Sequence, residues 1–105
     1  MNEAVIFDRY YNGEKNFFTP KVYGYERKNI NDEYELVIEK SEGKGLFEAP
    51  LYGCSILIVH KWKKTARKIE LSKAFGSRKE VEEYIKSITV EDVLNAEIFG
   101  EEKKI

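Results

Sequence analysis

The sequence has little cysteine, proline and histidine. Cys54 is the one thiol among 105 residues, so no disulfide can form within the chain and a disulfide-stapled secreted scaffold is excluded. No apolar stretch approaches the ~20 residues needed to cross a bilayer. The first residues also lack the basic and then apolar pattern of a signal peptide. We therefore expect a cytoplasmic protein without a membrane span.

Motifs for catalysis, metal binding and nucleotide binding are also missing. Cys54 and His60 are the only thiol and imidazole. Six residues of one strand would hold them about 20 Å apart, far beyond the ~3 Å of a catalytic pair, and they do not make a zinc site. Gly43-Lys44-Gly45 leads into a strand-like segment and so matches no phosphate-binding loop. We expect no cofactor, no metal and no enzymatic activity; an enzyme built from carboxylates, tyrosine and lysine is the third hypothesis.

The chain is rich in the groups that build a core. It is 42% hydrophobic and 13% aromatic, although 35% of its residues are charged. A chain of this length can bury enough apolar surface to fold without staples, and it fits one domain. We expect that domain over residues 1–100 and a flexible tail over residues 101–105.

Apolar residues at alternate positions predict an antiparallel sheet. Ala4–Tyr10 is rich in β-branched and aromatic side chains, and Asn12-Gly13 favours a hairpin turn into a return strand over Glu14–Phe18. Glu33–Glu39 alternates cleanly, which is typical of a half-buried strand. Ile56–Val59 is apolar without alternation, which indicates a central strand covered on both faces.

The hydrophobic period changes from 2 to 3.6 near the C-terminus. Ser77 and Glu80 have the spacing of a capping box, and Thr89 can cap a second helix. The apolar face of that second helix would consist of Val90, Val93, Leu94 and Ile98. The predicted fold is α+β: an antiparallel β-meander of five to seven strands followed by two short C-terminal helices packed on one sheet face. An SH3-like or OB-like barrel with appended helices is the alternative.

The charge is distributed unevenly along the chain. Residues 1–59 carry a net charge of −3, residues 60–79 carry +7 and residues 80–105 carry −5. A concentrated positive region can bind phosphate groups, and aromatic faces nearby could stack on a base. The alternatives are a solvated surface and a block paired with the acidic helices, within the chain or in a partner copy. The acidic helix disfavours duplex DNA as a partner.

Our leading hypothesis is a small non-enzymatic protein that captures a phosphate-bearing, nucleotide-like ligand and acts by sequestration or regulation. Cationic side chains would neutralise the phosphate, and Trp62 or Tyr23 would stack on the base. The predicted ligand-binding residues are Lys61, Trp62, Lys63, Lys64, Arg67 and Tyr23.

Aromatic residues crowd the first half of the chain. Neighbouring aromatics on a strand point to opposite faces, so we expect some to stay exposed and to form an interface. The predicted interface residues are Tyr10, Tyr11, Phe17 and Phe18. A homo-oligomer is expected on this basis. The alternative function is a protein–protein inhibitor or adaptor that docks a partner through these aromatics and a sheet edge.

Overall fold

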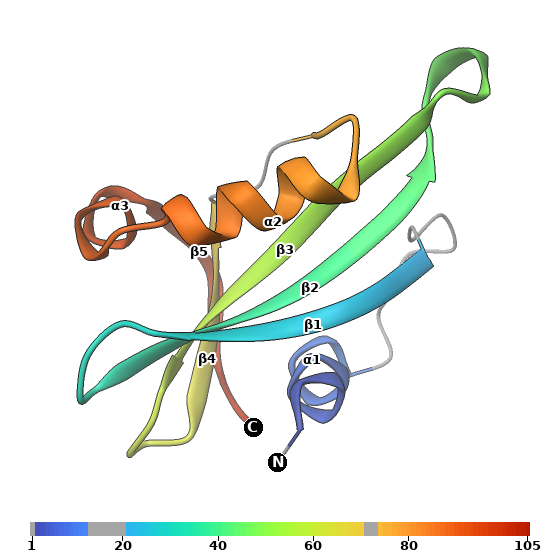
Figure 1. Cartoon of the computed structure of the whole chain (residues 1–105). Coiled ribbons are helices and arrows are strands. Elements are labelled where there is room, and N and C mark those ends of the chain that lie inside the picture. Colours follow the sequence, from blue (N-terminus) through green and yellow to red (C-terminus); the bar gives the residue numbers. More distant parts are fainter. Residues whose placement is uncertain (1, 13–20, 71–73) are drawn as a thin grey trace.

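The computed structural model describes residues 2–12, 21–70 and 74–105, and within them the chain forms three α-helices and five strands (Figure 1). In chain order the elements are α1 (Glu3–Tyr11), β1 (Lys21–Asn29), β2 (Tyr34–Lys44), the 3₁₀ turn η1 (Leu46–Glu48), β3 (Pro50–His60), β4 (Thr65–Glu70), α2 (Arg78–Ser87), α3 (Val90–Asn95) and β5 (Glu97–Lys104). Among the described residues, no helix has the length and apolar character required to span a membrane.

The strands form one antiparallel sheet in the order β1-β2-β3-β4-β5. The α+β class, the antiparallel meander and the helices near the C-terminus are thereby confirmed. The longest pairing joins β2 to β3, from Tyr34 opposite His60 to Lys44 opposite Pro50. The far ends of these two strands project from the sheet as an arm that is tipped by η1 (Figure 1).

The C-terminal residues are part of the sheet, so the flexible tail expected over residues 101–105 is wrong. β5 pairs with β4, and Lys104 lies opposite Thr65. The backbone N–H of Ile105 donates to the carbonyl of Lys64 at 3.0 Å. Residues 101–104 are all charged, which hides the strand from a hydrophobicity pattern, but charged residues suit an edge strand.

The N-terminal segment is a helix, so the strand predicted over Ala4–Tyr10 is wrong. The side chain of Asn2 caps α1 by accepting a backbone N–H three residues on, at 2.9 Å. Asn12 ends the helix in the left-handed conformation, with φ 47°, and is therefore a C-cap rather than the start of a hairpin turn. The predicted return strand over Glu14–Phe18 lies outside the described residues.

Burial on one side of α1 explains why the helix forms. Ile6, Phe7 and Tyr10 are buried, and they pack on the sheet face that carries Val37 and Leu57. The β-branched and aromatic composition favours a strand, but intrinsic propensities are weak and tertiary packing overrides them.

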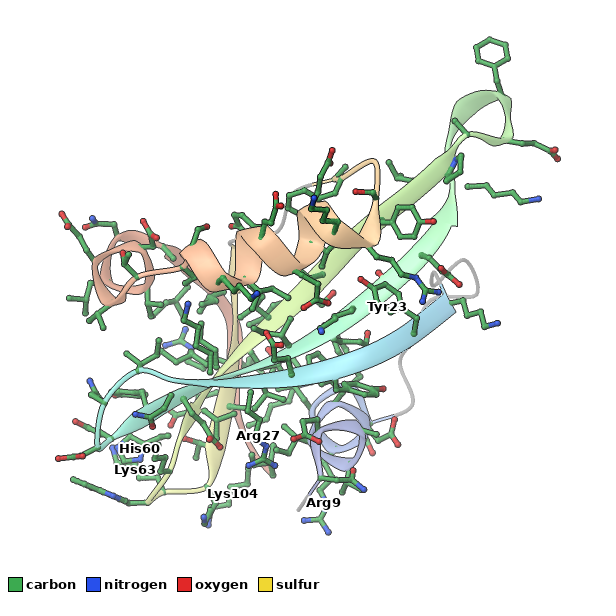
Figure 2. All side chains as sticks on the ribbon, viewed as in Figure 1. Arg9, Tyr23, Arg27, His60, Lys63 and Lys104 are labelled. Atoms are coloured by element: carbon green, nitrogen blue, oxygen red, sulfur yellow. The ribbon has the colours of Figure 1, made fainter. Side chains whose placement is uncertain are left out.

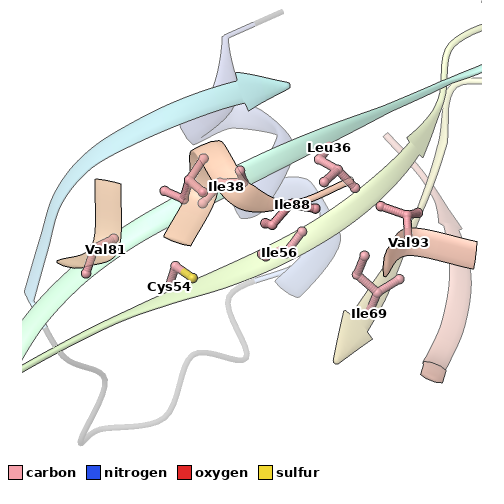
Figure 3. Close-up of a cluster of buried hydrophobic side chains, with 9 residues drawn as sticks. Leu36, Ile38, Cys54, Ile56, Ile69, Val81, Ile88 and Val93 are labelled. Carbon is pink, nitrogen blue, oxygen red and sulfur yellow. The ribbon is translucent and has the colours of Figure 1, made fainter. Parts of the chain in front are cut away.

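Helices α2 and α3 cover the opposite face of the sheet. On β2, Leu36 and Ile38 point toward these helices, whereas Val37 between them points toward α1. Cys54 and Ile56 of β3 and Ile69 of β4 complete the sheet side of this core (Figure 3). The helices and the link between them contribute the buried residues Val81, Ile85, Ile88 and Val93. The central strands are therefore covered on both faces, as the run Ile56–Val59 predicts.

Both C-terminal helices begin at the predicted caps. The hydroxyl of Ser77 accepts the backbone N–H of Glu80 at 3.2 Å. The carboxylate of Glu80 accepts from the backbone N–H of Gly76 at 2.9 Å, one residue before the partner expected for a capping box. Thr89 and Asp92 form the complete capping box at the start of α3.

The apolar face predicted for the second helix is only partly buried. Val93 is buried in the core, but Leu94 is 79% exposed and Val90 is 45% exposed. Ile98, also 45% exposed, belongs to β5 rather than to the helix. Helix α3 therefore uses one side to close the core and presents its other apolar residues at the surface.

Candidate functional site

The turn between β3 and β4 is fastened to the turn between β1 and β2. The backbone N–H of Lys61 donates to the carbonyl of Glu33 at 2.9 Å. The ammonium of Lys61 donates to the side-chain oxygen of Asn29 and, at 2.6 Å, to the carbonyl of Asn31. Lys61 is thus committed to holding the two turns together.

His60 fixes the same turn from inside. It is 6% exposed, and its Nε2 lies 2.9 Å from Oε1 of Glu33. Its Nδ1 accepts the backbone N–H groups of Trp62 at 3.3 Å and Lys63 at 3.1 Å. The ring therefore sets the path of the chain that presents both side chains.

Three rings line up along this end of the sheet. The rings of Tyr34 and His60 meet edge to face with centroids 5.0 Å apart, and His60 meets Trp62 in the same way at 5.7 Å. Trp62 is 70% exposed. The row thus leads from the sheet to the surface.

A pocket of about 330 Å³ opens between this end of the sheet and α3. Its apolar lining includes Tyr34, Ile58, Val93, Leu94 and Ile98. Its polar lining includes His60, Lys63, Arg67 and Glu102. Apolar walls with a few convergent polar groups are typical of small-molecule sites.

The predicted cations separate onto different sides of the turn. Lys63 and Arg67 line the pocket beside α3, whereas Lys61 and Lys64 line a second hollow, of about 490 Å³, next to α1. In that second hollow Arg27 forms ion pairs with Glu3 at 2.8 Å and with Glu35 at 3.3 Å. The carboxylates of Glu3 and Glu35 thus already pair with Arg27, one of the three cations that line the second hollow.

The rest of the basic block is scattered. The ammonium of Lys68 lies 6.0 Å from the ring centroid of Tyr11 on the α1 face, and Arg78 pairs with Glu42 at 2.7 Å. Glu82 of α2 pairs with Lys40 at 2.6 Å and not with the turn. Within residues 2–12, 21–70 and 74–105, neither Lys63 nor Lys64 forms an ion pair. The helices' glutamates therefore leave the basic turn available to a ligand.

Tyr23 lies apart from the basic turn. It lies beside Lys40 on β2, and Lys40 is opposite Cys54 on β3. Cys54 and His60 are six positions apart on β3, which corresponds to about 20 Å along the strand. Figure 2 shows His60 and Lys63 at one end of the sheet and Tyr23 toward the other end of β1. The guanidinium of Arg78 instead lies over the ring of Tyr23, 4.2 Å from the ring centroid. The structure thus does not bring Tyr23 to the pocket.

Tyr10 and Tyr11 do not lie on the exposed patch that the strand interpretation implied. Tyr10 is 5% exposed, and its hydroxyl accepts the backbone N–H of Lys68 at 3.2 Å. Tyr11 is half-buried and stacks on Phe7 with centroids 6.2 Å apart. The other two predicted interface residues, Phe17 and Phe18, lie outside the described residues.

Cys54 lies away from the pocket in the core beneath α2, and burial raises the pKa of its thiol to about 11. It is thus a packed thiol rather than a nucleophile. In the part of the chain that the structure describes, no three His, Cys, Asp or Glu side chains gather in a way that could hold a metal ion.

The sequence analysis missed Tyr34, Glu102 and Ile98 as pocket residues. Each reaches the pocket through pairing or packing between distant segments, and no local motif marks them. The chain has no match among protein-family models, curated proteins or solved structures.

Proposed function

We propose that the protein is a non-enzymatic binding protein that captures a small phosphate-bearing ligand in the pocket beside α3. The observation that carries the proposal is that Lys63 and Arg67 line one pocket together with the ring of Tyr34. Cationic groups can pair with a phosphate, and an aromatic face can stack on a base. Capture of this kind fits sequestration or regulation.

The pocket limits the ligand to a small size. A volume of about 330 Å³ lies at the lower end of the range for small-molecule sites. A mononucleotide suits it better than a dinucleotide or a polymer. Arg67 would supply a planar, two-pronged donor to the phosphate, and Lys63 would supply a point charge at the rim.

The arrangement around His60 favours binding over catalysis. Its Nε2 meets Glu33, and its Nδ1 accepts two backbone N–H groups of its own turn. A general base needs a nitrogen within hydrogen-bond reach of the substrate proton. The ring of His60 therefore serves to shape the site.

A thermal-shift and calorimetry series with nucleoside monophosphates and inorganic phosphate tests the proposal. We expect a ligand-dependent rise in midpoint temperature that falls as salt increases. Lys63→Glu should abolish the rise. Lys64→Glu is the matched control, because it reverses the neighbouring charge on the other side of the turn and should retain the rise.

Loss of binding in Lys64→Glu but not in Lys63→Glu would move the site to the hollow beside α1. No shift with any phosphate compound at millimolar concentration would overturn the proposal. Arg67→Lys adds a milder probe, since it keeps the charge and removes the fork; we expect it to weaken binding without abolishing it.

A further inference from the structure

An apolar surface strip lines one side of the pocket. We call Val90, Leu94 and Ile98 the α3 strip; all three are exposed, and all three line the pocket. Trp62, a fourth exposed apolar side chain, does not line the pocket itself, but its ring meets that of His60, which does. Contiguous exposed apolar groups around a hollow mark interaction surfaces more often than isolated ones do.

Charges of opposite sign border the α3 strip. Helix α3 carries Glu91 next to the strip, and Glu102 of β5 lines the pocket below it; both are exposed. Lys63 lies on the other border, in the turn that carries Trp62. The surface thus runs from acidic through apolar to basic.

We propose that a second copy of the chain covers this surface in a two-fold symmetric dimer. A two-fold axis places the same patch of both copies face to face, so each residue meets a different residue of the partner twice. Here the axis would bring Lys63 of each copy against Glu91 of the other, with the α3 strips packed in the centre and Trp62 at the border beside Lys63.

The two signs of charge favour a second copy over other occupants. Where a two-fold patch has a charged border, unlike charges meet only if the two signs lie on opposite sides of the apolar centre, as they do here. An acidic protein or a nucleic acid that extends across the whole surface would match the border at Lys63 but would be repelled at Glu91 on the other border. The dimer goes beyond the proposed ligand capture and requires no ligand; because both use Lys63 and the same pocket, a second copy and a bound phosphate would compete for this surface.

Light scattering after size exclusion and sedimentation velocity, both without ligand, test the dimer. We expect the wild type to move from monomer to dimer between about 1 and 100 μM and to stop at two copies. Leu94→Glu should weaken association roughly tenfold or more, since it places charge in the apolar centre. Leu51→Glu, in the projecting arm and 45% exposed, is the matched control and should dimerise like the wild type.

Charge reversal tests the predicted pairing directly. Lys63→Glu and Glu91→Lys should each be monomeric, because like charges then meet at both contacts. An equimolar mixture of the two variants should recover dimers. In that mixed dimer a carboxylate of the first variant meets an ammonium of the second at both contacts, and added salt should weaken the pairing.

The dimer proposal is overturned if the wild type stays monomeric at about 100 μM or if it assembles into oligomers larger than two copies. It also fails if Leu94→Glu dimerises like the wild type, or if the mixture of variants stays monomeric. Circular dichroism of each variant separates lost association from lost folding.

Discussion

His60 Nε2 lies 2.9 Å from Glu33 Oε1, and this contact joins the β3–β4 turn to the β1–β2 turn. The other ring nitrogen, Nδ1, accepts two backbone N–H groups. A nitrogen that accepts such bonds carries no proton, so Nε2 carries it and donates to Glu33. The contact is thus a hydrogen bond from a neutral ring to a carboxylate.

We therefore expect the hydrogen bonds of His60, rather than a charge on its ring, to contribute to stability. His60→Phe fills a similar volume but removes both ring nitrogens, which bond to two backbone N–H groups and to Glu33. We therefore expect the free energy of unfolding to fall by about 1–3 kcal/mol. Glu33→Gln keeps an acceptor for Nε2 and should cost less than about 0.5 kcal/mol. Urea denaturation of both variants measures the difference. Equal losses would instead indicate an ion pair with a protonated ring.

The buried thiol of Cys54 predicts a pH dependence of stability. Burial raises its pKa from 9.0 to about 11, so between these values the folded state retains a proton that the unfolded state releases. Its contribution is complete below pH 9 and is lost as the pH rises toward 11, by about 2–3 kcal/mol at most. We expect wild-type stability to fall more steeply than that of Cys54→Ala across this window.

Tyrosines also titrate near this window, so the informative quantity is the difference between the two proteins in urea denaturation at each pH. Burial is the main cause that raises the pKa of Tyr23 and Tyr25 in both proteins, and this effect cancels in that difference. The charge of Cys54 adds a smaller increase to the pKa of Tyr23, so that part belongs to the Cys54 effect being measured. A constant gap between wild type and Cys54→Ala from pH 8 to 11 would contradict the prediction.

Local periodicity predicted the elements whose burial repeats along the chain. The alternation of Glu33–Glu39 identified β2 as a strand but predicted only one buried face, whereas α1 and α2 cover both, so that Val37 and Glu39 are buried as well. Helix α2 shows a helical stripe because only one side meets the sheet. The pocket combines Tyr34, Arg67 and Glu102, which come from three strands. Only the sheet order brings them together, so charge clustering found Arg67 and no local pattern found the other two.

Substitution of Phe7 tests the packing of α1, the helix that the composition predicted to be a strand. It is fully buried under the sheet, so Phe7→Ala should lower the free energy of unfolding by about 3–5 kcal/mol. Arg9→Ala, on the exposed side of the same helix, should change it by less than about 0.5 kcal/mol. Chemical denaturation measures both. Similar small losses would mean that α1 does not pack on the sheet.

Phe47 at the tip of the β2–β3 arm predicts a stabilising substitution. The residue is 99% exposed and has φ 58° and ψ 27°, a left-handed conformation that costs a residue with a side chain roughly 1–2 kcal/mol. Glycine adopts it without that cost but loses about 0.5–1 kcal/mol more backbone entropy on folding. Phe47→Gly should therefore raise the free energy of unfolding by roughly 0.5–1 kcal/mol.

The matched control for this substitution is Phe47→Ala, which removes the ring but keeps the Cβ atom, so it should give no gain. Thermal and urea unfolding of the three proteins separate the effects of backbone and ring. Equal stability of the glycine and alanine variants would show that backbone strain is not stored at this position. A loss in both variants would show that the exposed ring packs on something in the monomer.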